Sequence, residues 1–321
     1  MASSPLIRIA ILDDYQNVAL EMADWSPLKD RADITVFNDH EADTGKLIAR
    51  LQPFDVICVM RERTPITRQV VESLPNLKLI ASTGIRNASI DTDAAADRGI
   101  SVVNTGYSST ATIEFTWALI LAMSRNIPLE AQSVREDGWQ LAVGTELAGK
   151  TLGVLGLGHI GSAVGVIGRA FRMNVIAWSQ NLTAERTESK GVQRVDKDTL
   201  FSTSDFLTIH LRLSERTQGL VGAEEFARMK KTSRLINTSR GPIVDTSALI
   251  EALTSGQIGG AAIDVYDTEP LELGHPLRSL RNVLATPHIG YVTRELYQTF
   301  YGDTVRNIVE WLDQSQRTDH A

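Results

Sequence analysis

Three residues in the last third of the chain have side chains suited to oxidation or reduction at a carbon beside a carboxylate. Arg240 lies in INTSRGPIVD, Glu269 in AAIDVYDTEP and His288 in ATPHIG, each just after an apolar segment. Arginine offers a permanently charged planar fork that matches a carboxylate, and histidine can exchange a proton near neutral pH. A hydrogen bond from the His288 imidazole to the Glu269 carboxylate would raise the imidazole pKa and fix the orientation of the ring. The set predicts a carboxylate clamp and a proton donor for a carbonyl that receives a hydride.

A glycine-rich segment near the middle of the chain predicts where the hydride carrier binds. In VLGLGHIG, Gly156, Gly158 and Gly161 form a G-x-G-x-x-G pattern between a strand-like and a helix-like segment. The first glycine permits a tight turn, the second lets the backbone approach a pyrophosphate, and the third lets the helix sit close to the strand. This context predicts a dinucleotide at the helix N-terminus.

Taken singly, Arg240, Glu269 and His288 also fit structural roles. Their combination with this glycine loop favours catalysis.

The residue that would distinguish NAD from NADP is unusual. An NAD site commonly has an acidic residue about 20 positions after the glycines, at the end of the next strand. Ser179 occupies that position, in VIAWSQN. Ser179, Gln180 and Arg186 offer groups for a 2′-phosphate, whereas the serine hydroxyl alone would suit a ribose hydroxyl. Both NAD and NADP therefore remain open.

Short apolar segments alternate with helix-like segments along the whole chain, and this pattern predicts parallel sheets. Continuous apolarity without a period of two is typical of strands covered on both faces. In the first third the expected strands are Leu6–Leu12, Asp33–Phe37, Asp55–Met60, Leu77–Ser82 and Ile100–Asn104. After it they are Thr151–Leu155, Asn174–Trp178, Phe206–His210, Arg234–Asn237, Ala261–Val265 and Val283–Ala285. The carboxyl ends of parallel strands share one sheet edge, so Arg240, Glu269 and His288 should meet beside the cofactor crevice.

Helices are expected between the strands and at the chain's end. The patterns predict Ile66–Leu74, Thr92–Arg98 and a buried helix over Thr110–Ile127 that is apolar nearly all round. A last helix would bury one face, formed by Leu296, Phe300, Val305, Ile308, Val309 and Leu312.

The change of unit near residue 105 is abrupt and has no linker, which predicts that one domain is inserted into another. We expect residues 106–290 to form an NAD(P)-binding domain. Residues 1–105 and 291–321 would form a discontinuous substrate-binding domain, with the final helix packing on the N-terminal part. The expected fold class is α/β with two Rossmann-like, doubly wound domains.

Composition excludes several classes of protein. The net charge of −7 argues against a nucleic-acid surface. The single cysteine, Cys58, excludes an internal disulfide and is expected in the core. The N-terminus does not have the pattern of a signal peptide, and apolar runs are too short for a membrane span. We expect a cytoplasmic protein that binds no metal, no nucleic acid and no membrane.

Several motifs in one order make the chain resemble a known family. With GLGHIG, INTSRGPIVD, DVYDTEPL and TPHIG, and with MRERTPIT and AADRGISVVNT upstream, it resembles the D-isomer-specific 2-hydroxyacid dehydrogenases. That group contains glyoxylate/hydroxypyruvate reductases and phosphoglycerate dehydrogenases. The resemblance covers essentially the whole chain. It implies reversible reduction of a small 2-oxo acid to the D-2-hydroxy acid with NAD or NADP, a flavodoxin-like discontinuous substrate domain, and a homodimer.

The resemblance also implies roles for individual residues. His288 would be the acid/base, Glu269 its partner and Arg240 the substrate clamp. The cofactor would contact Gly156, Gly158, His159, Ile160, Gly161, Ser179, Gln180, His210, Thr238, Ser239, Asp264 and Gly290, with Asp264 on the nicotinamide carboxamide. The substrate would contact Arg61, Gly84, Ile85, Arg86 and Arg240, while Arg63 would be a solvated neighbour.

Three positions depart from the family's pattern. Arg86 in STGIRNASID stands where relatives have a second glycine, and it either favours acidic substrates or points to solvent. Arg212 replaces the proline usual after the histidine of HLRL, and Tyr291 replaces a small residue after HIG. These departures affect the identity of the 2-oxo acid rather than the three catalytic candidates.

Other functions fit parts of the pattern. A formate dehydrogenase of this fold would have an amide in place of Glu269, whereas a phosphite dehydrogenase would suit the same three residues. A catalytically silent NAD(H)-sensing scaffold would bind the dinucleotide without turning over any 2-oxo acid. We also expect no regulatory domain like that of longer phosphoglycerate dehydrogenases, because the chain ends at residue 321.

Overall fold

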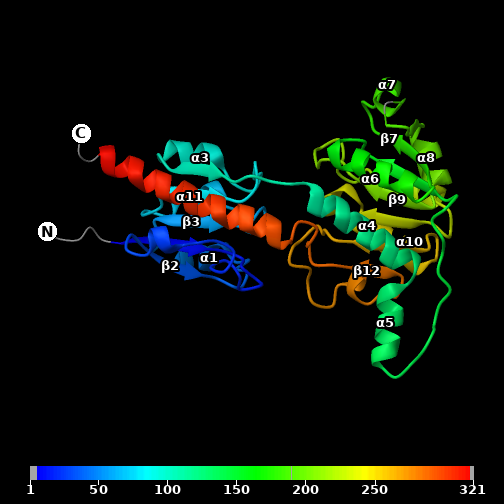
Figure 1. Cartoon of the computed structure of the whole chain (residues 1–321), viewed down its shortest axis with the longest axis horizontal. Coiled ribbons are helices and arrows are strands. Elements are labelled where there is room, and N and C mark those ends of the chain that lie inside the picture. Colours follow the sequence, from blue (N-terminus) through cyan, green and yellow to red (C-terminus); the bar gives the residue numbers. More distant parts are fainter. Residues whose placement is uncertain (1–5, 189, 319–321) are drawn as a thin grey trace. The chain divides into compact units, whose positions relative to one another are not determined.

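The computed structural model describes residues 6–188 and 190–318. The chain divides into two compact units, Met1–Ser108 with Val292–Ala321, and Ser109–Tyr291. The boundaries expected from the sequence fall after residues 105 and 290. Each unit holds a parallel sheet with its own helices (Figure 1), so the predicted α/β class with two Rossmann-like domains is confirmed.

The first unit is built on a parallel sheet that has five strands among its described residues, in the order β2-β1-β3-β4-β5. The strands are β1 (Ile7–Ile11), β2 (Ala32–Val36), β3 (Val56–Val59), β4 (Leu79–Ser82) and β5 (Ser101–Asn104). The helices are η1 (Ser26–Leu28), α1 (Thr44–Leu51), α2 (Arg68–Glu72), α3 (Thr92–Asp97) and α11 (Arg294–Thr318). Every residue of β3 and β4 is buried, as their continuous apolarity predicts.

Helix α11 closes the first unit and has the predicted buried face. Of the six apolar residues expected there, Val309 is half-buried and the other five are buried, namely Leu296, Phe300, Val305, Ile308 and Leu312. The helix packs on β4 and η1, which brings the end of the chain back to its N-terminal part.

The second unit holds a parallel sheet with seven strands among its described residues, in the order β12-β11-β10-β9-β6-β7-β8. The strands are β6 (Thr151–Leu155), β7 (Asn174–Trp178), β8 (Gln193–Arg194), β9 (Phe206–Ile209), β10 (Arg234–Asn237), β11 (Gly260–Ile263) and β12 (Val283–Ala285). The helices are α4 (Thr110–Ser124), α5 (Ile127–Arg135), α6 (His159–Ala170), α7 (Ala184–Glu188), α8 (Lys197–Thr203), α9 (Ala223–Arg228), η2 (Gly241–Ile243), α10 (Thr246–Thr254) and η3 (Pro276–Arg278). Among these strands, the sequence predicted all but β8, whose two residues are too few to give an apolar pattern.

The single helix predicted over Thr110–Ile127 is wrong. Helix α4 ends at Ser124, and Asn126 has a left-handed backbone with φ 53° before α5 begins. Asparagine tolerates this conformation better than most residues, and Pro128 fits the first turn of the new helix. The apolar pattern continued through a break that depends on backbone conformation rather than on hydrophobicity.

Two further expectations can be checked on the described residues. None of their helices has the length and apolar character needed to cross a bilayer. Cys58 is buried in β3 as predicted, and burial raises the pKa of its thiol to about 12.

Candidate functional site

The carboxyl ends of three adjacent strands in the second unit carry the predicted catalytic residues. Strands β10, β11 and β12 pair side by side in parallel. Arg240 follows β10, Glu269 follows β11, and His288 follows β12. The fold therefore places these three residues on loops at one edge of one sheet, as expected for an open α/β sheet.

Glu269 and His288 form the predicted pair. The imidazole Nδ1 of His288 lies 2.5 Å from Oε2 of Glu269. Burial raises the pKa of the Glu269 carboxyl, but the hydrogen bond and the charge of His288 outweigh it and hold that pKa below its usual value. The backbone N–H of Tyr266 also donates to Oε1 of Glu269 at 2.9 Å. The carboxylate thus stays ionised at neutral pH and fixes the ring through one nitrogen.

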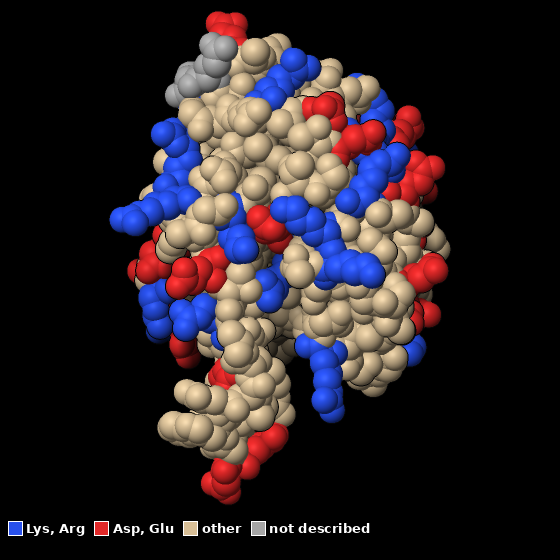
Figure 2. Space-filling model, turned by 90° about the vertical axis from the view of Figure 1, so that its right-hand side faces the viewer, with Lys and Arg blue, Asp and Glu red and all other residues tan. Residues whose placement is uncertain are grey.

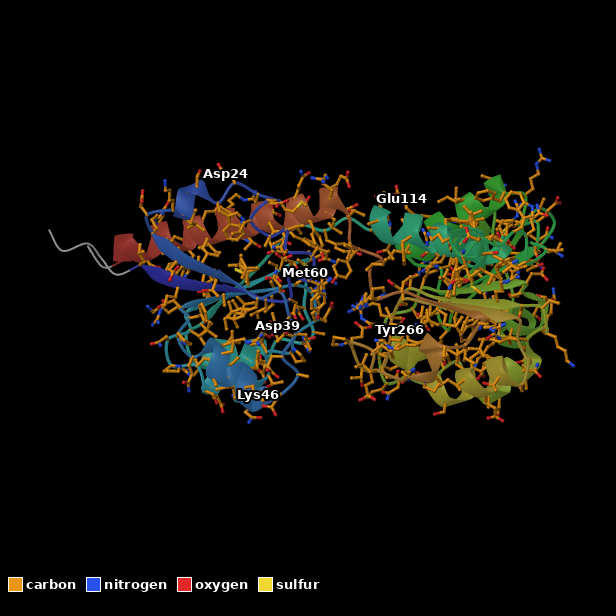
Figure 3. All side chains as sticks on the ribbon, turned by 90° about the horizontal axis from the view of Figure 1, so that it is seen from below. Asp24, Asp39, Lys46, Met60, Glu114 and Tyr266 are labelled. Atoms are coloured by element: carbon orange, nitrogen blue, oxygen red, sulfur yellow. The ribbon has the colours of Figure 1, made fainter. Side chains whose placement is uncertain are left out.

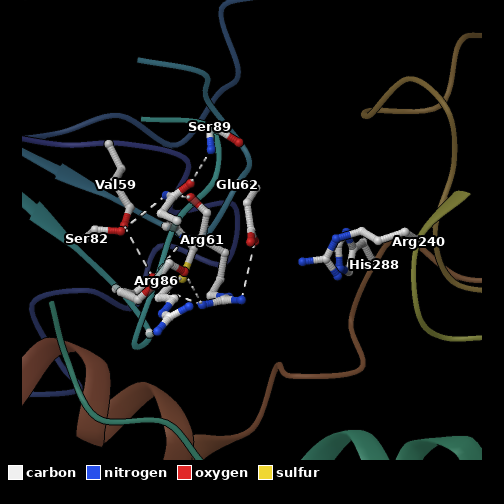
Figure 4. Close-up of polar contacts among 12 residues, drawn as sticks. Val59, Arg61, Glu62, Ser82, Arg86, Ser89, Arg240 and His288 are labelled. Carbon is white, nitrogen blue, oxygen red and sulfur yellow. Dashed lines mark hydrogen bonds and ion pairs between the residues drawn. The ribbon is translucent and has the colours of Figure 1, made fainter. Parts of the chain in front are cut away.

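Arg240 lies near this pair. Its positive charge is among the influences that lower the pKa of the Glu269 carboxyl. Its Nη1 donates to the carbonyl of Ser239 at 2.8 Å. Figure 4 shows the Arg240 side chain extending from that loop toward the position of His288 in the same view.

Asp264, expected on the cofactor, is engaged with the loop that carries His288. Its carboxylate accepts hydrogen bonds from the Thr286 hydroxyl at 2.7 Å, from the N–H of Ile289 at 2.9 Å and from the N–H of Gly290 at 2.8 Å. Burial raises the pKa of this carboxyl above its usual value. Two predicted cofactor residues, Asp264 and Gly290, are thereby bonded to each other.

The glycine loop connects β6 to α6 with the geometry that the pattern predicts. Gly156 has φ +102°, and a β-carbon there would lie 2.7 Å from the carbonyl oxygen of His210. A β-carbon at Gly161 would lie 2.1 Å from the carbonyl oxygen of Gly156, so the helix approaches the turn closely. At Gly158, the N-cap of α6, no atom lies within 4 Å of that position. The open space stands before the first N–H groups of α6, where a pyrophosphate would bind.

The remaining predicted cofactor residues lie on neighbouring loops of the same unit. His159 and Ile160 open α6, while Ser179 and Gln180 follow β7. His210 follows β9, and desolvation lowers the pKa of its imidazole to about 3, which leaves it neutral beside the Thr208 hydroxyl at 2.9 Å. After β10, Thr238 lies 3.0 Å from the Thr116 hydroxyl of α4. Ser239 donates its hydroxyl to the carbonyl of Leu211.

The four predicted substrate residues outside the second unit gather at two loops of the first. The Arg61 guanidinium donates to the carbonyl oxygens of Thr83 and Arg86 at 3.2 and 3.5 Å, and it lies 3.4 Å from the Glu62 carboxylate (Figure 4). A β-carbon at Gly84 would lie 1.8 Å from that guanidinium, so the glycine makes room for it. Ile85 and Arg86 are exposed.

Arg63 is not the solvated neighbour that the sequence suggested. Its Nη1 donates to the carbonyl of Asp13 at 2.7 Å, and its guanidinium lies 4.5 Å from the centre of the Tyr15 ring. Its Nη2 also donates to the Tyr297 hydroxyl at 3.3 Å. Asp13 and Tyr15 lie in the loop after β1, whereas Tyr297 lies on α11, far away in the sequence.

Of the departures from the family's pattern, Tyr291 contacts the proposed acid/base. Its ring lies edge-on to the His288 imidazole, with centroids 5.5 Å apart. Arg212 is exposed, and only its backbone carbonyl has a described bond, from Thr217. Among the described residues there is also no cluster of three or more His, Cys, Asp or Glu that would hold a metal ion.

Sequence reasoning missed two residues that position this site, Thr286 and Tyr266. Thr286 bonds Asp264, and the Tyr266 hydroxyl lies 2.8 Å from the Thr286 carbonyl oxygen. Both stand in motifs that the sequence presents, ATPHIG and DVYDTEP, but nothing in their type or spacing signals these bonds.

The chain is similar to known proteins over most of its length. Residues 117–290 match the model of the D-isomer specific 2-hydroxyacid dehydrogenase NAD-binding domain. The chain is 42% identical over 262 residues to a D-3-phosphoglycerate dehydrogenase of Archaeoglobus fulgidus, covering 79% of this chain and 50% of that protein. It is 38% identical over 293 residues to a hydroxypyruvate reductase of Thermotoga maritima, covering 90% and 92%. The chain thus spans about half the length of the first relative and most of the second.

A solved structure described as a phosphoglycerate oxidoreductase from Vibrio cholerae has the same fold. It superposes with a TM-score of 0.91 at 37% sequence identity, over 96% of this chain and 100% of that one. The likeness therefore extends over both units and is not limited to the glycine loop.

Proposed function

The chain belongs to the D-isomer-specific 2-hydroxyacid dehydrogenase family, and we propose that it reduces a small 2-oxo acid reversibly to the D-2-hydroxy acid with NAD(H) or NADP(H). One observation carries the proposal. His288, oriented by Glu269 at 2.5 Å, follows β12, which pairs with the strand before Glu269, and that strand pairs in turn with the one before Arg240; all three belong to the unit that also holds the glycine loop. Hydride acceptance by a carbonyl needs a proton donor and a cation, and this edge offers both.

The residues of the second unit fit a nicotinamide dinucleotide. The open space at Gly158 and the N–H groups of the first turn of α6, which no described side chain caps, suit a pyrophosphate. When bound, the dinucleotide supplies or accepts the hydride. Because Ser179 stands at the end of β7, no carboxylate there would repel the 2′-phosphate of NADP. We therefore propose NAD or NADP as the cofactor.

We assign each catalytic candidate one role in reduction. The Arg240 guanidinium holds the substrate carboxylate and polarises the adjacent carbonyl. His288 donates a proton from Nε2 to the carbonyl oxygen, because Glu269 occupies its Nδ1. In the oxidative direction the same nitrogen takes the proton back. Glu269 stabilises the imidazolium and holds the ring in this orientation.

We propose the first unit as the substrate-binding domain, with Arg61, Gly84, Ile85 and Arg86 at the substrate. The support is local: Arg61 holds the 83–86 segment through two carbonyls, and that segment exposes Ile85 and Arg86. The names of the relatives point to phosphoglycerate, hydroxypyruvate or similar compounds, all small and anionic. A cation at Arg86 would favour an acidic substrate.

A cytoplasmic homodimer is part of the same proposal. Residues 127–143, which contain α5 and the loop after it, expose several large apolar side chains: Ile127, Leu129, Val134, Trp139, Leu141 and Val143. The lobe at the bottom of Figure 2, at the height of α5 in Figure 1, is mostly uncharged, whereas the rest of that face mixes basic and acidic side chains. An exposed apolar patch of this kind marks an interface, and a second copy is the partner that we propose.

The test is a substrate panel. Glyoxylate, hydroxypyruvate, pyruvate and bulkier or more acidic 2-oxo acids are each mixed with NADH and with NADPH, and loss of absorbance of the reduced cofactor is followed. We expect turnover of at least one 2-oxo acid and none of formate with NAD or NADP. Turnover of phosphite alone would favour the phosphite-type reaction, and tight NADH binding without any turnover would favour a sensing scaffold.

A further inference from the structure

Tyr266 connects two strand ends of the second unit through its hydroxyl. The phenol oxygen lies 2.8 Å from the carbonyl oxygen of Thr286, just after β12, and 3.1 Å from that of Ile263, the last residue of β11. The side chain is buried, and burial, with the nearby charges of Asp264 and Glu269, raises the pKa of the phenol. The hydroxyl therefore stays protonated and donates its one proton mainly to the nearer carbonyl, that of Thr286.

The backbone of the same residue contacts the other two catalytic segments. Its N–H donates to Oε1 of Glu269 at 2.9 Å. A β-carbon at Gly241 would lie 2.1 Å from the Tyr266 carbonyl carbon, so the residue after Arg240 packs directly on the Tyr266–Asp267 peptide. Figure 3 labels Tyr266 within this unit. One residue thus touches the segments that carry Arg240, Glu269 and His288.

The Thr286 carbonyl that accepts from Tyr266 also sets the turn at His288. It accepts the N–H of His288 at 3.0 Å, and His288 has φ +53°, a conformation that side-chain-bearing residues rarely adopt. The position of the imidazole relative to Glu269 therefore depends on where this carbonyl is held.

Tyr266 belongs to the buried hydrophobic cluster of the second unit and also borders a cavity. This cavity of about 200 Å³ is also lined by Asn237, Val244 and His275.

We propose that Tyr266 is a positioning residue for the reaction. Its hydroxyl holds the 286–288 turn, and its backbone N–H orients the Glu269 carboxylate, so that the His288 imidazole and this carboxylate meet. This inference rests on the proposed function. It assigns to the phenol a role that phenylalanine, which has the same ring, cannot supply.

The test compares Tyr266→Phe with Tyr301→Phe. Tyr301, on α11 of the first unit, is also buried, but among the described residues its hydroxyl has no hydrogen-bond partner. The 2-oxo acid turned over fastest by the wild-type protein is used between pH 5.5 and 9. For Tyr266→Phe we expect kcat to fall about fivefold to tenfold, as for loss of one buried hydrogen bond, with KM nearly unchanged. The pH above which reduction declines should also be lower than in the wild-type protein. Tyr301→Phe should match the wild-type protein in kcat, KM and pH profile.

A second measurement does not need turnover. The proton on His288 Nδ1 should give a low-field ¹H NMR signal, assigned by its loss in Glu269→Gln. In Tyr266→Phe this signal should broaden or move, and in Tyr301→Phe it should not. Wild-type kcat, pH profile and NMR signal in Tyr266→Phe would overturn the inference. So would lower thermal stability with an unchanged pH profile and signal, because the hydroxyl would then be merely structural. If the wild-type protein reduces no 2-oxo acid, the proposed function fails, and the NMR comparison alone decides the positioning role.

Discussion

At the scale of single residues, His288 occupies a backbone conformation that has to be enforced by its surroundings. A left-handed residue with a β-carbon costs about 1–2 kcal/mol. Hydrogen bonds on both sides hold the turn: the N–H of His288 bonds Thr286, and those of Ile289 and Gly290 bond the Asp264 carboxylate. These hydrogen bonds keep His288 beside Glu269. Backbone strain of this kind is common at functional sites.

Replacing His288 by alanine tests its role as acid/base. Turnover should fall about a hundredfold or more, as when a general acid/base is lost, while binding of the reduced cofactor is retained. Steady-state kinetics and quenching of cofactor fluorescence measure the two effects. His275→Ala provides the control, since its Nδ1 accepts the N–H of Leu277 at the start of η3, away from the His288 turn. Near-normal turnover in His288→Ala would remove the proposed role.

Glu269 gives the reaction a predictable pH dependence. The pKa of its carboxyl is lowered in the folded protein, so the negative charge of Glu269 is complete above the ordinary range of a glutamate. It is lost only as pH falls through the lowered value. In Glu269→Gln the imidazolium loses its anionic partner, and reduction should decline at a lower pH than in the wild-type protein. Profiles of kcat/KM from pH 5 to 9 test this, and coincident profiles would show that the carboxylate does not support the proton donor.

At the scale of elements, the turn from β6 to α6 allows packing and cofactor binding to be separated. Gly161→Ala places a β-carbon 2.1 Å from the Gly156 carbonyl oxygen, so it should lower the melting temperature by several degrees. Gly158→Ala meets no atom within 4 Å, and with φ −79° and ψ −158° it should fold normally. It should nevertheless weaken NAD(H) binding at least tenfold, because the methyl group occupies the space proposed for the pyrophosphate. Calorimetry and cofactor titration distinguish the two, and wild-type affinity in Gly158→Ala would contradict the proposed location.

The elements also show what the sequence could and could not predict. Buried parallel strands such as β3 and β4 lie in largely apolar runs, and helices such as α3 begin at an aspartate whose carboxylate caps them. The break between α4 and α5 depends on the φ of Asn126, and apolar periodicity does not report φ. Arg63, Thr286 and Tyr266 could not be placed because their partners are decided by tertiary packing. The catalytic candidates were found because their chemistry is distinctive and each follows a strand.

At the scale of the whole molecule, the proposed homodimer gives the last prediction. The segment 127–143 exposes Trp139 to 75% and Val143 to 95%. Exposed apolar side chains on one short segment are costly in water unless a partner covers them. Light scattering after size exclusion should therefore give about twice the 35.2 kDa of one chain. The double variant Trp139→Asp, Val143→Asp should give a monomer, since two buried charges would oppose association.

Leu273 supplies the matched control for this experiment. It lies in the same unit, outside the 127–143 segment, and is 94% exposed. Leu273→Asp adds a charge at a single exposed apolar position, so it should leave the dimer intact and the melting temperature nearly unchanged. A monomeric wild-type protein would contradict the homodimer, and a double variant that stays dimeric would place the interface elsewhere. Dissociation by Leu273→Asp as well would point to the loop after β11 as part of the interface.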